Sequence, residues 1–482
     1  ALCALEDTRA EGARKALVQA ATGVGKTYLA AFDSKNYKRV LFVAHREEIL
    51  NQAALSFKNV RNSDDYGFFT GKSKENARSV IFASVSTLGR KEYLTEEYFT
   101  KDYFDYIVID EFHHAVNDQY RRIIEYFEPK FLLGLTATPD RMDGRNIYEI
   151  CDYNVPYEIS LGDAINKGML VPFHYYGIYD ETDYSTLKLV KGRYDEKDLN
   201  DKYIGNAKRY DLIYKYYKKY HSKRALGFCS SRMHAEEMAK EFCKRGIKSV
   251  AVYSNADGEF SEERNRAIEQ LKNQEIKVIF SVDMFNEGVD IASLDMVMFL
   301  RPTESPIVFL QQLGRGLRRY AGKEYLNVLD FIGNYNNNFM IPVALSGDRT
   351  YNADTIRKYV ISGNNTIPGA STVHFDEIAK EKIFNSIDKI RGMKSIIRES
   401  YISLKNRIGR IPLLYDFYEQ GEIDPLVIIK EYKTYWQFLE AVETGKDSCK
   451  LNDQEKLILE YLSKTILSGV RPSELCILKE FL

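Results

Sequence analysis

The 482-residue sequence has few cysteines, no long apolar run and almost no excess of either charge. Its six cysteines are scattered without a CxxC pair, which argues against a disulfide framework or a zinc site built from them. No stretch of about 18 uninterrupted apolar residues occurs, and the N-terminus is acidic where a secretory signal is basic, so we expect a cytoplasmic protein without a membrane partner. The formal charge of −1 excludes a histone-like polycation. Any contact with nucleic acid should therefore be local.

The composition is that of a folded chain with more than one core. The sequence is 44% hydrophobic and 28% charged, which excludes a disordered or collagen-like protein. At roughly 150 residues per domain, the length predicts about three domains. The chain opens on Ala1 and ends on Leu482, which indicates a segment of a longer protein.

Two series of short apolar, β-branched runs predict two domains with parallel sheets. The intervals between the runs have helical spacing, which is typical of βαβ units. Beyond about residue 345 helical periodicity replaces the runs, and 426–429 favours helix because it continues into polar residues. We expect an α/β chain with domains at 1–160 and 161–345, followed by a mostly helical domain at 346–482. The expected strands are 15–20, 40–44, 80–84, 106–110 and 131–136 in the first domain, and 225–229, 249–253, 278–281, 296–300 and 325–329 in the second.

The first expected strand leads directly into a glycine-containing loop and then a helix, the order that binds nucleotide phosphates. Glycines let backbone N–H groups converge on the phosphates, and the helix N-terminus adds its positive dipole end. Lys26 would neutralise the outer phosphates, and the Thr27 hydroxyl would coordinate Mg²⁺. The predicted ATP-binding loop consists of Thr22, Gly23, Val24, Gly25, Lys26 and Thr27.

An acidic pair, Asp110 and Glu111, follows another expected strand of the first sheet. The carboxyl edge of such a sheet is where α/β proteins bind ligands. Asp110 would hold Mg²⁺, and Glu111 would orient and deprotonate an attacking water. Thr136 and Thr138 end the next strand, where their hydroxyls could link these carboxylates to the neighbouring domain.

The second domain supplies a basic segment that could complete this site. Arg315 and Arg318 are three residues apart and therefore share a face if the segment is helical. Both could reach a γ-phosphate bound by the first domain, as arginine fingers that accelerate hydrolysis by about 10³ to 10⁵.

Together these elements resemble the superfamily 2 helicases of the DExH type, within the branch of restriction-enzyme motor subunits and excision-repair helicases. The tail that begins near 327–335 resembles a bacterial subgroup of DEAD/DEAH-box proteins. In that subgroup a phospholipase D-like nuclease module often precedes the motor, and a domain of unknown function follows it. The matching segments are 20–27, 43–47, 110–114, 136–139, 286–290 and 311–318.

The resemblance implies two RecA-like P-loop domains that close on ATP and Mg²⁺ and step along a nucleic acid, which we expect to be DNA. The chain would be a nucleic-acid-dependent ATP hydrolase, a DNA helicase or translocase, with any nuclease module outside this segment. The implied roles are catalysis for Glu111, Gln311, Arg315 and Arg318, ATP binding for Gly288 and Asp290, coupling for His113, Thr136 and Thr138, and nucleic-acid binding for His45, Arg46, Ser84 and Ser281.

Two alternatives remain open from the sequence. The motifs contact ATP and the nucleic-acid backbone, so an RNA helicase would carry them as well. An ATP-gated clamp that does not step is the other alternative.

Residues 208–220 mix basic and aromatic side chains, as strand-binding surfaces do, but their apolar spacing favours a helix that packs on the second domain.

Overall fold

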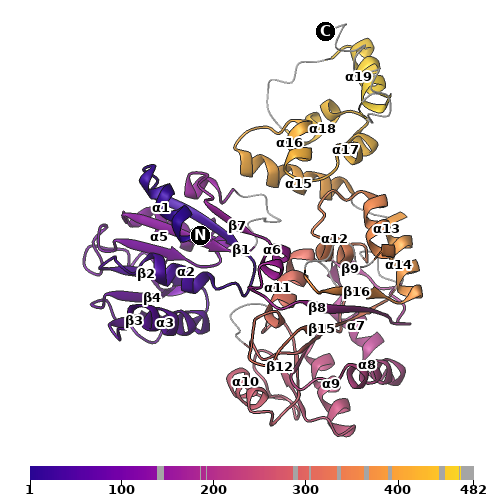
Figure 1. The fold of residues 1–482 in the computed structure, drawn as a ribbon, viewed down its shortest axis with the longest axis horizontal. Helices are drawn as coiled ribbons and strands as arrows, with labels where there is room; N and C mark the ends of the chain where they lie inside the picture. Colours follow the sequence, from indigo (N-terminus) through magenta and orange to yellow (C-terminus); the bar gives the residue numbers. More distant parts are fainter. Residues whose placement is uncertain are drawn as a thin grey trace.

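The computed structural model describes residues 1–137, 146–184, 186–190, 193–285, 291–302, 305–333, 338–362, 369–388, 393–443, 451–465 and 467. Two sheet-containing lobes lie side by side, and a helical unit follows the second lobe (Figure 1). Helices α6 (Leu161–Asn166) and α11 (Pro306–Gly316) lie between the two lobes.

The first lobe is a seven-stranded parallel sheet in the order β3-β4-β2-β5-β6-β1-β7. Helices α1 (Leu2–Ala10), α2 (Lys26–Asp33) and α3 (Glu47–Arg61) share a core with one face of the sheet. Helices α4 (Val85–Leu88) and α5 (Asp118–Tyr126) pack on the other face. The strands are β1 (Lys15–Ala20), β2 (Val40–Ala44), β3 (Tyr66–Phe69), β4 (Val80–Ser84), β5 (Tyr106–Ile109), β6 (Phe131–Thr136) and β7 (Tyr157–Ile159).

The second lobe is another seven-stranded parallel sheet, in the order β12-β13-β11-β14-β15-β8-β16. Its strands are β8 (Phe173–Tyr179), β11 (Ala225–Phe228), β12 (Ser249–Val252), β13 (Val278–Ser281), β14 (Met296–Phe299), β15 (Leu326–Ile332) and β16 (Thr372–Phe375). Its other helices are α7 (Glu196–Tyr203), α8 (Ala207–Tyr220), α9 (Arg232–Lys244), α10 (Arg264–Lys272), α12 (Met340–Ser346), α13 (Ala353–Ser362) and α14 (Glu377–Asp388). A short antiparallel pair, β9 (Leu189–Val190) and β10 (Arg193–Tyr194), lies outside the large sheets.

The C-terminal unit is helical and has a core of its own. Helices α15 (Met393–Ile408), α16 (Leu414–Glu419), α17 (Pro425–Tyr432) and α18 (Tyr435–Val442) pack around the buried side chains of Tyr401, Phe417 and Phe438. Helix α19 (Asp453–Thr465) follows. The prediction of a helix through 426–432 is confirmed by α17. Within the described ranges, no helix is both long and apolar enough to cross a bilayer.

The expected α/β class is confirmed, and all expected strands are present within a few residues of their predicted limits. Strands β3, β7, β8 and β16 were not expected. β8 has aromatic residues in place of an aliphatic run, although it lies inside the sheet between β15 and β16. Because β16 extends the second sheet past residue 345, the domain limits stay predictions.

Candidate functional site

The phosphate loop connects β1 to α2, as the strand, loop, helix order requires. Gly23 and Gly25 have φ values of +92° and +94°, a region that side-chain-bearing residues rarely adopt. A Cβ atom on Gly23 would lie 3.0 Å from Cγ of Arg318, so the second lobe packs directly on this loop. The loop therefore offers backbone N–H groups at the start of a helix, which is an arrangement suited to phosphate.

The side chain of Lys26 folds back on its own loop. Its Nζ atom donates a hydrogen bond of 2.8 Å to the carbonyl oxygen of Ala20. Burial lowers the pKa of Lys26, while the nearby carboxylates of Glu111 and Asp110 act in the opposite direction. A bound phosphate would stabilise the charged form of this lysine and draw it from the Ala20 carbonyl.

The two acids follow β5 at the carboxyl edge of the first sheet. Asp110 is buried, and its burial together with the charge of Glu111 raises its pKa. Glu111 has a φ of +49°, a left-handed conformation that is strained for a residue other than glycine and recurs at functional sites. Holding the Glu111 carboxylate in this position therefore costs backbone conformational energy.

A polar chain joins Glu111 to the neighbouring strand. Oε2 of Glu111 lies 3.4 Å from Nδ1 of His113, which lies 3.3 Å from Oγ1 of Thr136 at the end of β6. The structure thus brings together three residues that the sequence predicted, one for catalysis and two for coupling. The fourth, Thr138, lies outside the described residues.

The residues present fit a magnesium ion. Among the described residues, no group of three or more His, Cys, Asp or Glu side chains could hold a metal without other ligands. Mg²⁺ does not need one, because it is commonly held by one or two carboxylates and the phosphates of the substrate. Oε2 of Glu111 is buried without a hydrogen bond, and Asp110 beside it is disfavoured as an anion. A cation at Asp110 and Thr27 would relieve this excess of buried acid.

Helix α11 brings the second lobe to the phosphate loop. A Cβ atom on Gly314 would lie 2.8 Å from Cβ of Thr22, so only glycine permits this approach. Arg315 is buried, and the charges of Arg315 and Arg318 both act to lower the pKa of Lys26. Gln311, on the same helix, lines a cavity of about 920 Å³ together with Thr22. These predicted residues therefore meet at one interface.

The residues expected to bind nucleic acid differ from one another in position and burial. His45 and Arg46 follow β2, and the ring of His45 lies 5.3 Å from that of His114. Ser84, at the end of β4, is nearly buried and donates a hydrogen bond of 2.9 Å to Thr87. Ser281 is fully buried at the end of β13. In this conformation neither serine is open to a strand. Gly288 and Asp290 lie outside the described residues.

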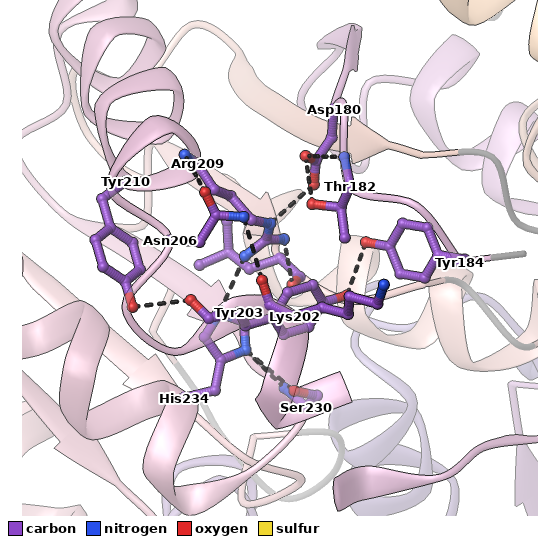
Figure 2. Close-up of polar contacts among 11 residues, drawn as sticks. Asp180, Thr182, Tyr184, Lys202, Tyr203, Asn206, Arg209, Tyr210, Ser230 and His234 are labelled. Atoms are coloured by element: carbon purple, nitrogen blue, oxygen red, sulfur yellow. Dashed lines mark hydrogen bonds and ion pairs between the residues drawn. The ribbon is translucent and has the colours of Figure 1, made fainter. Parts of the chain in front are cut away.

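The basic, aromatic segment 208–220 forms helix α8, and it packs by its buried residues Arg209, Tyr210, Ile213 and Tyr217. This supports the packing interpretation. Figure 2 shows Arg209 at the centre of a buried network. Its Nε atom lies 2.8 Å from Oδ2 of Asp180, and another guanidinium nitrogen donates to the carbonyl of Leu300 at 2.9 Å.

His234 completes the network from α9. Its Nε2 atom lies 3.2 Å from Arg209, and burial together with the Arg209 charge lowers the pKa of His234 well below its usual value. The imidazole is therefore neutral. Ser230 lies against the other ring nitrogen at 3.1 Å, so the start of α9 is tied to α8 (Figure 2). Sequence reasoning missed this network because Asp180 and Arg209 are separated by a stretch that includes β9, β10 and α7 and carries no signal of the pairing.

Three family models match successive parts of the chain. Residues 1–141 match the res subunit of type III restriction enzymes, and residues 208–320 match the helicase conserved C-terminal domain. Residues 397–482 match a domain of unknown function, DUF8090, which includes most of the C-terminal helical unit. The two restriction and helicase matches fall on the two lobes that meet at the phosphate loop.

Known proteins give the same picture. A 51.5 kDa protein of Lactococcus phage (isolate 7-9) is 29% identical over 326 residues, which are 66% of each chain. The EcoAI type I restriction enzyme endonuclease subunit of Escherichia coli is 28% identical over 367 residues, 66% of this chain and 44% of that one. The chain thus spans about half to two thirds of the length of these relatives.

Solved structures share the fold. A fragment described as an HsdR subunit of a type I restriction enzyme from Vibrio vulnificus is 25% identical, with a TM-score of 0.52 over 68% of this chain and 62% of that one. The type ISP restriction-modification enzyme LlaBIII has a TM-score of 0.56 at 14% identity, over 97% of this chain and 37% of that one.

Two tandem parallel-sheet lobes with a phosphate loop at their interface, together with the restriction-enzyme and helicase family matches on those lobes, make this chain a member of the superfamily 2 helicase family. Within that superfamily it belongs to the branch of the restriction-enzyme motor subunits.

Proposed function

We propose that this chain is an ATP-dependent DNA helicase or translocase, with RecA-like domains at 1–160 and 161–345 and a mostly helical domain at 346–482 that also contributes β16 to the second sheet. The observation that carries the proposal is the meeting of Lys26, Asp110 and Glu111 of the first lobe with Arg315 and Arg318 of the second. Charges of both signs converge there on one phosphate loop. An interface that contributes groups from both lobes can couple hydrolysis to movement of one lobe against the other.

In the proposed reaction, the loop N–H groups and Lys26 hold the β- and γ-phosphates of ATP. Mg²⁺, held by Thr27 and Asp110, would neutralise charge that develops on the phosphate oxygens. Glu111 orients a water molecule and accepts its proton as the oxygen attacks the γ-phosphorus, and ADP leaves. Arg315 and Arg318 stabilise the added negative charge from the second domain, with Gln311 beside them.

The polar chain from Glu111 through His113 to Thr136 supports a coupling role for the last two residues. Loss of the γ-phosphate changes the charge that faces Glu111, and His113 is its neighbour at 3.4 Å. Thr136 ends β6, beside β1 and the phosphate loop. A change at the nucleotide can therefore reach the edge of the sheet where Thr138 follows. ATP contacts from Gly288 and Asp290 would come from the second domain.

DNA is the substrate we propose, because the relatives include subunits of restriction enzymes. His45, Arg46, Ser84 and Ser281 would contact its backbone. Because the two serines are buried in this conformation, their surroundings must rearrange before they reach a strand. A nuclease module outside this segment would act on the DNA that the motor moves.

The proposal is tested by steady-state ATP hydrolysis without nucleic acid and with single-stranded DNA, double-stranded DNA or RNA. All arms use one stated salt concentration, because phosphate contacts are salt-dependent. Stimulation by DNA supports the proposal, and displacement of a third strand or of a complementary strand then separates a duplex translocase from a helicase. Stimulation by RNA alone contradicts the choice of DNA. Stimulated hydrolysis without any strand displacement contradicts stepping and favours a clamp.

A further inference from the structure

Lys323 lies just beyond α11, and its ammonium group is directed at backbone carbonyls. Nζ donates hydrogen bonds to the carbonyl oxygens of Ala292 at 3.0 Å, of Arg318 at 3.1 Å and of Gly316. A lysine ammonium has three donors, and all three are used here. The position is therefore fixed by three separate backbone contacts.

These carbonyls belong to two separate stretches of chain, one of which carries residues assigned to the nucleotide site. Gly316 is the last residue of α11, and Arg318 carries one of the proposed arginine fingers. The last carbonyls of a helix lack partners within the helix, and a cation is favoured there. Ala292 belongs to the other stretch, which leads into β14, so Lys323 ties the approach to β14 to the end of α11.

The same turn is held from the other side by the linker between the lobes. The N–H of Val171 donates to the carbonyl of Leu317 at 2.8 Å, and Arg319 donates to the carbonyl of Gly168 at 3.1 Å. The backbone from Gly316 to Arg319 is thus clamped between Lys323 and the linker. This turn carries Arg318 and begins one residue after Arg315, so it sets the backbone position of Arg318 and of the end of the helix that carries Arg315.

The surroundings of Lys323 lower the pKa of its ammonium group. Burial lowers its pKa to about 8, the charge of Arg318 acts in the same direction, and Asp295 opposes both. The carbonyls hold the side chain of Lys323 in place, but its lowered pKa means that it loses its proton at mildly alkaline pH. Arginine, which stays protonated at any working pH, would lack this sensitivity.

We propose that Lys323 is a positioning residue for ATP hydrolysis, which fixes the turn after α11 so that Arg315 and Arg318 reach the γ-phosphate. This rests on the proposed function. Lys323 does not contact the nucleotide; it acts through the backbone of the residues that do.

The test compares wild type with Lys323→Met, Lys323→Arg and, as the control, Lys218→Met, which removes an exposed lysine from α8. For Lys323→Met we expect the nucleic-acid-stimulated kcat to fall by about 10- to 100-fold, as misplaced catalytic groups do. The KM for ATP should stay within about twofold if Lys26 and its loop still bind. In wild type kcat should decline above about pH 8, and Lys323→Arg should retain activity while that alkaline decline is reduced.

Amide hydrogen exchange at residues 315–319 is the second readout, and it does not require activity. Faster exchange there in Lys323→Met, with Lys218→Met like wild type, supports the proposal. Unchanged exchange in this turn overturns it, as does an unchanged kcat. If wild type hydrolyses no ATP under any condition, the proposed function fails, while the exchange result still decides whether Lys323 fixes the turn.

Discussion

Arg264 of α10 lies 3.0 Å from Glu48 of α3, so an ion pair joins the two lobes. Glu48 belongs to the helix that begins just after His45 and Arg46, the residues expected to meet the nucleic acid. Arg264 is largely buried and lies over the ring of Phe285. The two lobes are therefore held together here by an ion pair, and at the phosphate loop by the close approach of α11.

Glu48→Gln should loosen this closed arrangement. Loss of a partly exposed pair costs up to about 1 kcal/mol, and the largely buried Arg264 loses this carboxylate. We expect a larger radius of gyration in small-angle scattering without nucleotide. Glu47→Gln is the matched control, because Glu47 pairs with Lys72 of the same lobe at 3.2 Å. Equal radii for the two variants would contradict a closing role for the pair.

Lys26→Ala should abolish ATP turnover, and Glu111→Gln should keep ATP binding but lose hydrolysis. Lys26 is assigned to phosphate binding, whereas Glu111 is assigned to the attacking water, a contribution of about 10² to 10⁴ in rate. Nucleotide binding by calorimetry and turnover by phosphate release separate the two effects. Glu125→Gln changes an exposed carboxylate of the same lobe and serves as the control. Full turnover in either site variant would refute the assignment.

Arg209→Met should destabilise the second lobe by about 3 to 5 kcal/mol, because the buried charge of Asp180 would lose its cationic partner and keep only the hydrogen bonds from Thr182. Lys208→Met, on the exposed side of the same helix, should change the stability little. Unfolding in urea measures the stability of both variants. The double variant Arg209→Met with Asp180→Asn should recover part of the loss. If the double variant is no more stable than Arg209→Met, the orphaned charge is not the cause.

Asp330→Asn should stabilise the protein at neutral and alkaline pH. Asp330 is fully buried on β15, where Tyr175 donates a hydrogen bond of 2.7 Å to its carboxyl, and burial raises its pKa to about 7. The native state then holds a proton that the unfolded chain releases near pH 4, so stability falls as pH rises toward 7.

An asparagine at this position removes that dependence and can still accept from Tyr175. We expect a gain on the order of 2 kcal/mol at pH 8 that vanishes toward pH 4. Thermal unfolding across this range checks the prediction, with exposed Asp257→Asn as the control. A gain that is the same at both ends of the range would show that ionisation of Asp330 is not its source.

Much of the fold could be predicted because a buried parallel strand has a local signal in the sequence, which is a short run of apolar residues. Strands β1, β2, β4 and β6 have the predicted limits. Strand β8 could not be found in this way. It is rich in aromatic residues and lacks an aliphatic run, and its burial depends on α8 and on β16, far along the chain.

The sequence by itself determined the first half of the site. Lys26, Asp110 and Thr136 each end or follow a strand, and the carboxyl ends of parallel strands meet at one edge whatever the loops between them do. Only the tertiary structure decided the rest. The contact of Gly314 with Thr22, the buried Arg209 network and the hydrogen bond of Lys323 to Ala292 join segments whose separation along the chain carries no pattern. Such contacts depend on how packed lobes meet, and short-range periodicity does not record that.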